Sequence, residues 1–463
     1  MQFLQNKYHS KTDPLSYWLK IAFTIAVGLC FTVFFFFSPM QMLSEKSYAD
    51  GIFILIISLL ILLFCAVFFM LRVNIRSDVT YISLLAIAAA AIALRLFLFN
   101  AKSGDYNSFL SQWISQMRLL SGVKPITTPI GDYNMPYLYF LFFMSRSELY
   151  DLYLIKLLSV VFDFVLALGA VKLTGLFSKG DGSIIASFAA ALFAPTLFLN
   201  SAYWAQCDGI YTALCVWALY FSLKNRPKAS VVFFALAFSF KMQSIFIFPI
   251  IIFLILKHKI SLKHLIYFPI TFFLTLLPSL LCGRSFHDTF SIYIDQTSSY
   301  PSLTLNCPSL WAFFPEGQFE TFGSAALFLA GGACLAFGVF VYTKRDKLTD
   351  KLLFDTAFIF TLLLPFLLPR MHERYFYLAE ALSIIHVILH KDRIFVAPLI
   401  ILTGFCVYSN FLFGNQIFEL EFLSIINAAV ILYICKKFAD DLSNQNNVFI
   451  TAEQAQSEKE CLE

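Results

Sequence analysis

Six short polar motifs interrupt a sequence that is otherwise mostly apolar, and they hold the side chains that could do chemistry. A carboxylate can take a proton from a hydroxyl group as a general base. Arginine and lysine are the side chains that bind phosphate. The motifs therefore supply the parts for proton transfer beside a phosphate-bearing substrate. They are residues 104–107 (GDYN), 131–134 (GDYN), 204–208 (WAQCD), 240–243 (FKMQ), 286–288 (FHD) and 370–374 (RMHER).

A second set of polar stretches alternates with these motifs and carries clustered lysine and arginine. By the positive-inside rule these stretches are cytoplasmic, which puts the six motifs together on the outer face. A pore would distribute such groups along its path, whereas an enzyme of the outer leaflet would gather them at one mouth. The basic stretches hold Lys7/Lys11/Lys20, Arg72/Arg76, Lys172/Lys179, Lys224/Arg226/Lys228, Lys257/Lys259/Lys263, Lys344/Arg345/Lys347/Lys351, Lys391/Arg393 and Lys436/Lys437.

The composition excludes a soluble protein, because 59% of the residues are hydrophobic and only 13% are charged. The formal net charge of +4 needs no nucleic-acid partner, since the cations sit at helix ends. The ten cysteines show no Cys-x-x-Cys spacing, which argues against a zinc or thioredoxin-type site. Cys282 and Cys307 flank one outer loop and either form a disulfide or remain free. The apolar run 21–37 lacks a following cleavage site, which predicts a span rather than a signal peptide.

The apolar runs predict an all-α, polytopic integral membrane protein with about 12–14 transmembrane helices. An even number would place both termini in the cytoplasm. Several runs are shorter than the roughly 20 residues that cross a bilayer unaided, and one passage is expected to be broken between Lys241 and Pro249. The expected helices cover about 18–37, 51–72, 79–99, 152–174, 183–203, 208–223, 229–240, 244–256, 264–282, 322–342, 353–368, 375–389, 394–413 and 419–435.

These helices are expected to form one transmembrane domain over residues 1–440. Residues 1–78 would be extra N-terminal helices and 390–440 C-terminal helices, while the polar residues 441–463 predict a disordered cytoplasmic tail. In the first long outer loop, residues 105–120 place apolar side chains at helical spacing. That spacing predicts an amphipathic helix at the membrane surface.

Three acids of the outer motifs are candidates for chemistry, and each also has a structural explanation. Asp105 follows an apolar run within six residues, where a carboxylate suits a general base, although a helix cap or a solvated loop would also explain it. Asp132 lies in a Gly-Asp-Tyr-Asn turn, which turn chemistry alone accounts for. Asp208 begins a helix, where capping and the helix dipole favour an acid.

The basic side chains of the outer motifs point to an anion. Lys241 interrupts an almost wholly apolar run, so it either snorkels to the surface or has a partner such as phosphate, and Gln243 adds a neutral donor and acceptor. Arg370 and Arg374, with His372 between them, run against the positive-inside bias. Phosphate binding would explain this motif, and so would an Arg–Glu surface network.

Other ionisable residues fall inside expected helices. Arg95 is expected to snorkel outward. Lys156 and Asp163 share a helix face but are too far apart to pair directly. Glu380 and His386 are expected to hold helices together through hydrogen bonds inside the membrane.

From about Arg95 to Leu389, the order of these motifs resembles the GT-C superfamily of membrane glycosyltransferases that use polyprenyl-phosphate sugars. It looks closest to the dolichyl-phosphate-glucose-dependent glucosyltransferases of asparagine-linked glycosylation and their bacterial, mannosyltransferase-like relatives. Asn107 replaces a frequent acid of the family, and Cys207-Asp208 departs from the glucosyltransferase pattern. The matching segments are Gly104-Asp105-Tyr106-Asn107-Ser108 with Trp113, Asp132-Tyr133-Asn134-Met135-Pro136, Trp204 to Tyr211, Phe240-Lys241-Met242-Gln243 and His372-Glu373-Arg374.

The resemblance implies a GT-C-like fold over residues 79–389 and an inverting hexosyltransferase. Asp105 would be the catalytic base, and Lys241, His372 and Arg374 would bind the donor phosphate. No cofactor or metal is expected, because a lipid phosphate leaves readily. The partners would be a polyprenyl-phosphate-linked sugar, a glycan or glycolipid acceptor and membrane lipid. The residues implied to position the sugar or acceptor are Asp132, Asp208, Gln206, Gln243 and Tyr106.

Two other classes of protein fit parts of the pattern. A lipid-linked glycan flippase or secondary transporter would explain the many helices, but it predicts inverted repeats and midplane sites that the sequence does not show. A polysaccharide polymerase or ligase would share the outer arginines but not the leading Asp105 loop. The expected location is the bacterial inner membrane, with an extracytoplasmic active site.

Overall fold

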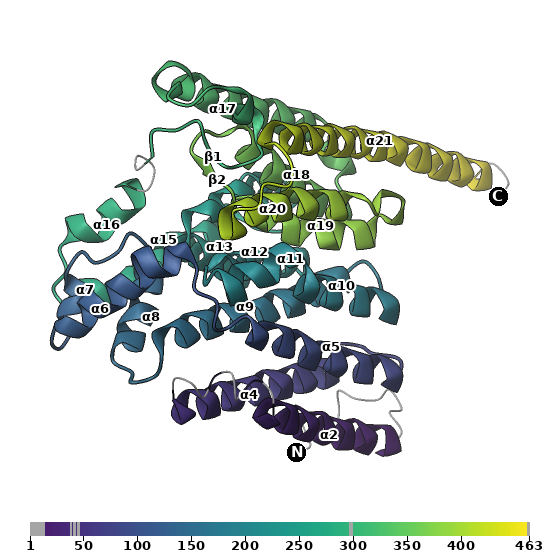
Figure 1. The fold of residues 1–463 in the computed structure, drawn as a ribbon. Coiled ribbons are helices and arrows are strands. Elements are labelled where there is room, and N and C mark those ends of the chain that lie inside the picture. Colours follow the sequence, from purple (N-terminus) through teal and green to yellow (C-terminus); the bar gives the residue numbers. More distant parts are fainter. Residues whose placement is uncertain (1–13, 38, 40–42, 44–46, 296–299, 461–463) are drawn as a thin grey trace.

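The protein is a multi-pass, nearly all-helical membrane protein (Figure 1). The computed structural model describes all residues except 1–13, 38, 40–42, 44–46, 296–299 and 461–463. Within this part, eight helices are long and apolar enough to span a membrane, or nine if one bent pair counts as a span. Several expected spans are shorter helices, so the count of 12 to 14 stays a prediction.

The long apolar helices lie mostly at the outside of the bundle. The window of α9 is 72% buried, against 11% for α2 and 17% for α17, so the last two expose most of their apolar surface, as lipid-facing helices do. The eight are α2 (Pro14–Phe37), α4 (Tyr48–Arg72), α5 (Asp78–Phe97), α9 (Asp151–Thr174), α15 (Tyr267–Leu281) with η4 (Leu262–Ile266), α17 (Phe319–Thr343), α20 (Val396–Phe413) with η7 (Lys391–Arg393), and α21 (Leu420–Glu460).

Shorter helices fill the centre, and several end at a polar motif. The bent pair is α10 (Asp181–Phe193) followed by α11 (Pro195–Phe198) and the π-helix η2 (Leu199–Tyr203), with a bend of 49°. In Figure 1, α9, α12 and α13 lie between the stack of α2, α4 and α5 and the pair α17 and α21. The other helices are α8 (Met135–Ser145), α12 (Asp208–Leu223), α13 (Pro227–Phe240), α14 (Ile250–Leu256), α18 (Asp350–Leu367) and α19 (Tyr377–Leu389).

The expected break near Lys241 is confirmed. Helix α13 ends at Phe240, Lys241 is extended with φ −156°, and a 3-10 helix, η3 (Met242–Ile247), follows. Pro249 then precedes α14, where proline fits the start of a helix. The break leaves the Lys241 side chain free to turn into the bundle rather than continue along a helix face.

Short helices and two short strands lie beside the central helices, at the end of the bundle that carries the polar motifs. The expected surface helix is present as the π-helix η1 (Tyr106–Leu110) and α6 (Ser111–Leu119), followed by α7 (Lys124–Thr127). The second long loop contains α16 (Phe286–Asp295), η5 (Leu310–Phe313) and a two-residue strand β1 (Thr304–Leu305). This strand pairs in parallel with β2 (Met371–His372). Figure 1 shows these elements on the left side of the bundle.

The basic stretches contact one another at the end of the bundle opposite the polar motifs. Lys20 pairs with Asp78 at 3.0 Å, and Lys259 pairs with Asp350 at 2.8 Å. Arg393 Nη2 lies 2.6 Å from Asp441 Oδ2. Such pairs join loops that are distant in sequence. The division of the chain into one basic end and one end carrying the motifs is therefore present in the fold.

One expectation differs from the structure. Arg95 does not snorkel outward; it is fully buried and its Nε lies 2.8 Å from Asp163 Oδ2, because a buried carboxylate on α9 is a better partner than distant water. Of the two alternatives left open for Cys282 and Cys307, the structure has both cysteines free. Helix α21 continues to Glu460 and residues 461–463 lie outside the described part, and the disordered cytoplasmic tail stays a prediction.

Membrane orientation remains a prediction that labelling tests. We expect a membrane-impermeant maleimide to label Ser121→Cys and Glu316→Cys in intact cells, because both positions are exposed at the end with the motifs. Lys179→Cys, exposed in a basic loop, should react only after permeabilisation. The protein without an introduced cysteine gives the background. Labelling of Lys179→Cys in intact cells would reverse the predicted orientation.

Candidate functional site

A cavity of about 520 Å³ at the end with the motifs brings five of the six together. It lies where η1, α8, η3 and the loop around β2 meet. Residues 286–288 do not line it. The lining side chains that can form hydrogen bonds or ion pairs are Asp105, Trp113, Asp132, Tyr133, Asn134, Gln206, Lys241, Gln243, Tyr300, Arg370, His372, Glu373, Arg374 and Tyr375.

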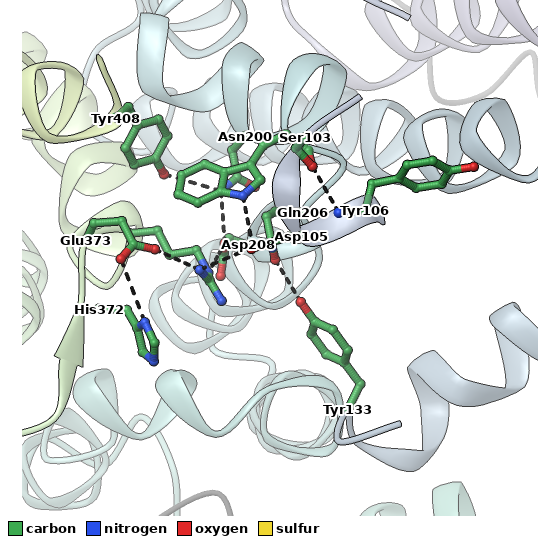
Figure 2. Close-up of polar contacts among 12 residues, drawn as sticks. Ser103, Asp105, Tyr106, Tyr133, Asn200, Gln206, Asp208, His372, Glu373 and Tyr408 are labelled. Atoms are coloured by element: carbon green, nitrogen blue, oxygen red, sulfur yellow. Dashed lines mark hydrogen bonds and ion pairs between the residues drawn. The ribbon is translucent and has the colours of Figure 1, made fainter. Parts of the chain in front are cut away.

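The Asp105 carboxylate is held in place on one side and open on the other. Its Oδ2 accepts hydrogen bonds from Trp204 Nε1 at 2.9 Å and from Gln206 Nε2 at 2.6 Å (Figure 2). Ser103 Oγ donates to Trp204 O at 2.6 Å, which ties the Asp105 loop to the same segment. Asp105 Oδ1 accepts no hydrogen bond from the described part of the chain. The carboxylate is therefore oriented, with one oxygen free for a ligand at the cavity.

Irregular backbone lies next to both segments of this contact and sets the direction of the Asp105 and Gln206 side chains. The π-helix η1 starts directly after Asp105, and η2 ends directly before Trp204. Ala205 has φ +65°, a left-handed conformation that alanine adopts only under constraint. π-Bulges and strained residues often occur at functional sites. Here they turn Gln206 back toward Asp105, a direction that a regular helix would not give.

Asp208 and Lys241 form a buried ion pair beneath Asp105. Lys241 Nζ contacts Asp208 Oδ1, and the Asp208 and Lys241 residues are 0% and 6% exposed. Asn200 Nδ2 donates to Asp208 Oδ2 at 2.9 Å, and Arg374 Nε lies 3.6 Å from the same oxygen. The expected partner for Lys241 was a phosphate; in the structure its partner is the carboxylate at the start of α12.

Arg374 links three carboxylates. Its Nη1 lies 2.8 Å from Glu373 Oε1 and 3.8 Å from Asp105 Oδ2, in addition to the Asp208 contact. Its guanidinium also lies 5.5 Å from the ring of Trp204. Glu373 is 3% exposed, so the alternative of a solvated Arg–Glu surface network does not describe this pair. Burial alone would raise the pKa of Glu373, but His372 and Arg374 hold it below its usual value.

Asp132 and His372 also line the cavity. Partial removal from water by the cavity walls raises the pKa of the Asp132 carboxyl, an effect that Arg374 and Lys241 oppose. Gly131 before it has φ +77°, and a Cβ there would lie 3.0 Å from the Trp113 ring, so the turn needs glycine. His372 Nδ1 lies 3.7 Å from Glu373 Oε2, and strand pairing of β2 with β1 fixes its backbone.

Among the residues expected to position a sugar or acceptor, Gln206, Gln243, Asp132 and Asp208 lie at or directly beneath the cavity, and Tyr106 does not. Tyr106 is 3% exposed and its hydroxyl donates to Asp151 Oδ1 at 2.9 Å. Figure 2 shows its ring directed away from Asp105. Its position therefore corrects the expectation that it contacts a ligand.

Four residues of the site carried no chemical role in the sequence prediction. Trp204 appeared only as part of the WAQCD motif, yet it is fully buried and donates to Asp105. Tyr133 OH donates to Gln206 Oε1 at 2.7 Å, which orients the amide that holds Asp105. Glu373 could have been identified from the sequence, because it is an acid between Arg370 and Arg374 in the RMHER motif. Asn200 lies in an apolar stretch, where nothing in the sequence indicates a chemical role.

Comparison of the sequence with protein-family models and with curated proteins finds no match. The likeness to a known superfamily thus rests on the sequence motifs alone.

Proposed function

We propose that the protein is an inverting glycosyltransferase of the bacterial inner membrane. It would move a hexose from a polyprenyl-phosphate sugar to a glycan or glycolipid acceptor on the extracytoplasmic face. The observation that carries this proposal is the oriented Asp105 carboxylate, with one free oxygen at a cavity that also holds Lys241 and Arg374. A base and two cations within one cavity are the parts that displacement of a phosphate leaving group requires.

In the proposed reaction, Asp105 Oδ1 takes the proton of the acceptor hydroxyl. The hydroxyl oxygen bonds to the anomeric carbon from the face opposite the leaving group, and the carbon–oxygen bond to phosphate breaks. The bonding electrons leave with the polyprenyl phosphate. Preorganised positive groups stabilise the charge that develops there.

Lys241 and Arg374 retain donors for this phosphate even while they contact acids. A lysine ammonium has three N–H donors and an arginine guanidinium has five. Lys241 uses one donor on Asp208, and Arg374 is oriented by Glu373 and Asp208. The acids thus hold the two cations at the cavity, where the remaining donors would be available to a ligand. His372 at the rim would add a further donor.

The apolar part of the cavity wall supports a lipid-linked donor. Phe109, Ile245, Phe246, Leu327 and Phe411 line it together with the charged residues. An isoprenoid chain needs such a surface next to its phosphate, whereas a free sugar nucleotide would need polar contacts to its base and ribose.

Transfer in detergent tests the proposal against the alternative of a flippase or transporter. We expect the purified protein to transfer sugar from a polyprenyl-phosphate donor to a matching acceptor without a gradient or a sealed compartment. Radiolabelled sugar appearing in the acceptor measures this. Binding of the lipid with no turnover across a donor and acceptor panel would favour the transporter.

The same assay, run with chelator, tests the expected metal independence of transfer. Asp105 has Asn107 rather than a second acid close to it in sequence, so no Asp-x-Asp pair is formed. We expect an unchanged rate. Loss of transfer that Mn²⁺ or Mg²⁺ restores would keep the glycosyltransferase but make Asp105, Asp132 or Asp208 metal ligands.

A further inference from the structure

A second polar cluster lies far from the cavity, between α18 and α19. Asp355 on α18 faces His386 on α19 and His390 at its C-terminal cap, and the three residues are 1%, 0% and 5% exposed. Asp355 stands 12 residues before the end of α18, which is about 18 Å along a helix. The cluster therefore lies toward the end with the basic loops, next to Lys391–Arg393.

The three side chains converge on one point. His386 Nδ1 lies 2.9 Å from Asp355 Oδ1, and His390 Nε2 lies 3.1 Å and 2.9 Å from Oδ1 and Oδ2. One ligand atom from each residue lies within 4.8 Å of the others. The two imidazole rings lie side by side, with centroids 4.5 Å apart and a tilt of 30°. We propose that Asp355, His386 and His390 bind one divalent transition-metal ion, with Zn²⁺ the best fit.

The spacing of the histidines suits this role. Residues i and i+4 of a helix point to one face, so His386 and His390 can present two nitrogens to the same ion. Imidazole favours zinc, copper, iron and nickel, and one carboxylate with two histidines is a frequent first coordination shell. From the sequence, His386 was expected only to hydrogen-bond between helices, and no role was assigned to His390.

Hydrogen bonding alone accounts for the cluster poorly. His386 Nε2 is buried and has no hydrogen-bond partner in the described part of the chain. Of the two ring nitrogens, Nδ1 contacts Asp355 Oδ1 at 2.9 Å, and Nε2 is left without the partner that buried polar atoms normally have. Arg393 of the following loop pairs with Asp441 at 2.6 Å, and in the described part of the chain the ion-pair partners of Asp355 are the two histidines alone.

The site would fasten α19 to α18 at the end opposite the cavity. Helix α18 leads into the Arg370–Arg374 loop and α19 leads out of it. A bond between these helices would hold together the two helices that lead into and out of this loop, at the helix ends farthest from the loop. It would be a structural site, separate from the transfer reaction.

Metal analysis of the full-length protein tests this inference. The protein should be purified without a histidine tag, dialysed against metal-free buffer and measured by mass spectrometry of its metal content. We expect about one zinc ion per chain, and visible absorption when Co²⁺ is loaded instead. His390→Gln and His386→Gln should lose the ion and the cobalt spectrum.

Two variants make the outcome decisive. His390→Cys retains a zinc ligand and should keep the metal, and His258→Asn removes an exposed histidine at the same end and should change nothing. The inference is overturned if the unaltered protein neither contains nor takes up Zn²⁺ or Co²⁺. Equal metal content in His390→Gln and the unaltered protein would also overturn it. Neither result depends on sugar transfer.

Discussion

Asp105→Asn is expected to lower sugar transfer by about 10²–10⁴-fold, the usual cost of losing a general base. The substitution keeps the shape of the side chain. The amide oxygen of asparagine can still accept from Trp204 and Gln206, which both donate to Oδ2 in the structure. Only the oxygen that faces the cavity is replaced, by an amide group that cannot take a proton. Folding and donor binding should therefore stay close to those of the unaltered protein.

Initial rates of transfer at saturating donor measure this effect, and donor binding is measured separately. Asp346→Asn is the matched control, because it changes an exposed acid in a basic loop in the same way. Asp346→Asn should transfer at the normal rate. Transfer by Asp105→Asn within a few-fold of normal would exclude Asp105 as the base and leave Asp132 as the next acid at the cavity.

The sequence predicts the helices and the gathering of the motifs well, because both follow from local patterns. Apolar runs give the helix positions, and the broken passage at Lys241 was visible as a charge followed by Pro249. The alternation of basic loops and polar motifs predicts two chemically different ends, which the loop–loop ion pairs and the cavity lining reproduce.

Partners inside the bundle could not be predicted, because they depend on contacts between distant segments. Arg95 meets Asp163 across 68 residues and Lys241 meets Asp208 across 33. No local rule pairs them. Ala205 has φ +65° although alanine carries no turn signal, so the direction of Gln206 could not be read from the chain. The fold imposes that conformation, and the contact to Asp105 depends on it.

Lys241→Met is expected to give the largest loss of stability among the site variants. It leaves the fully buried Asp208 carboxylate without its main partner, and breaking a buried pair in this way typically costs about 3–5 kcal/mol. Arg374 Nε, at 3.6 Å, offers only a longer contact. We therefore expect a clear fall in the thermal midpoint in detergent, measured by fluorescence of the native tryptophans.

The double variant Lys241→Met/Asp208→Asn separates the ion pair from simple packing. Removing both charges leaves no unpaired buried carboxylate, so the midpoint should recover much of the loss seen in Lys241→Met. Lys259→Met is the matched control: it breaks a pair whose Asp350 side chain is 44% exposed, which typically costs about 0–1 kcal/mol. If Lys241→Met and Lys259→Met shift the midpoint equally, the carboxylate of Asp208 is not desolvated.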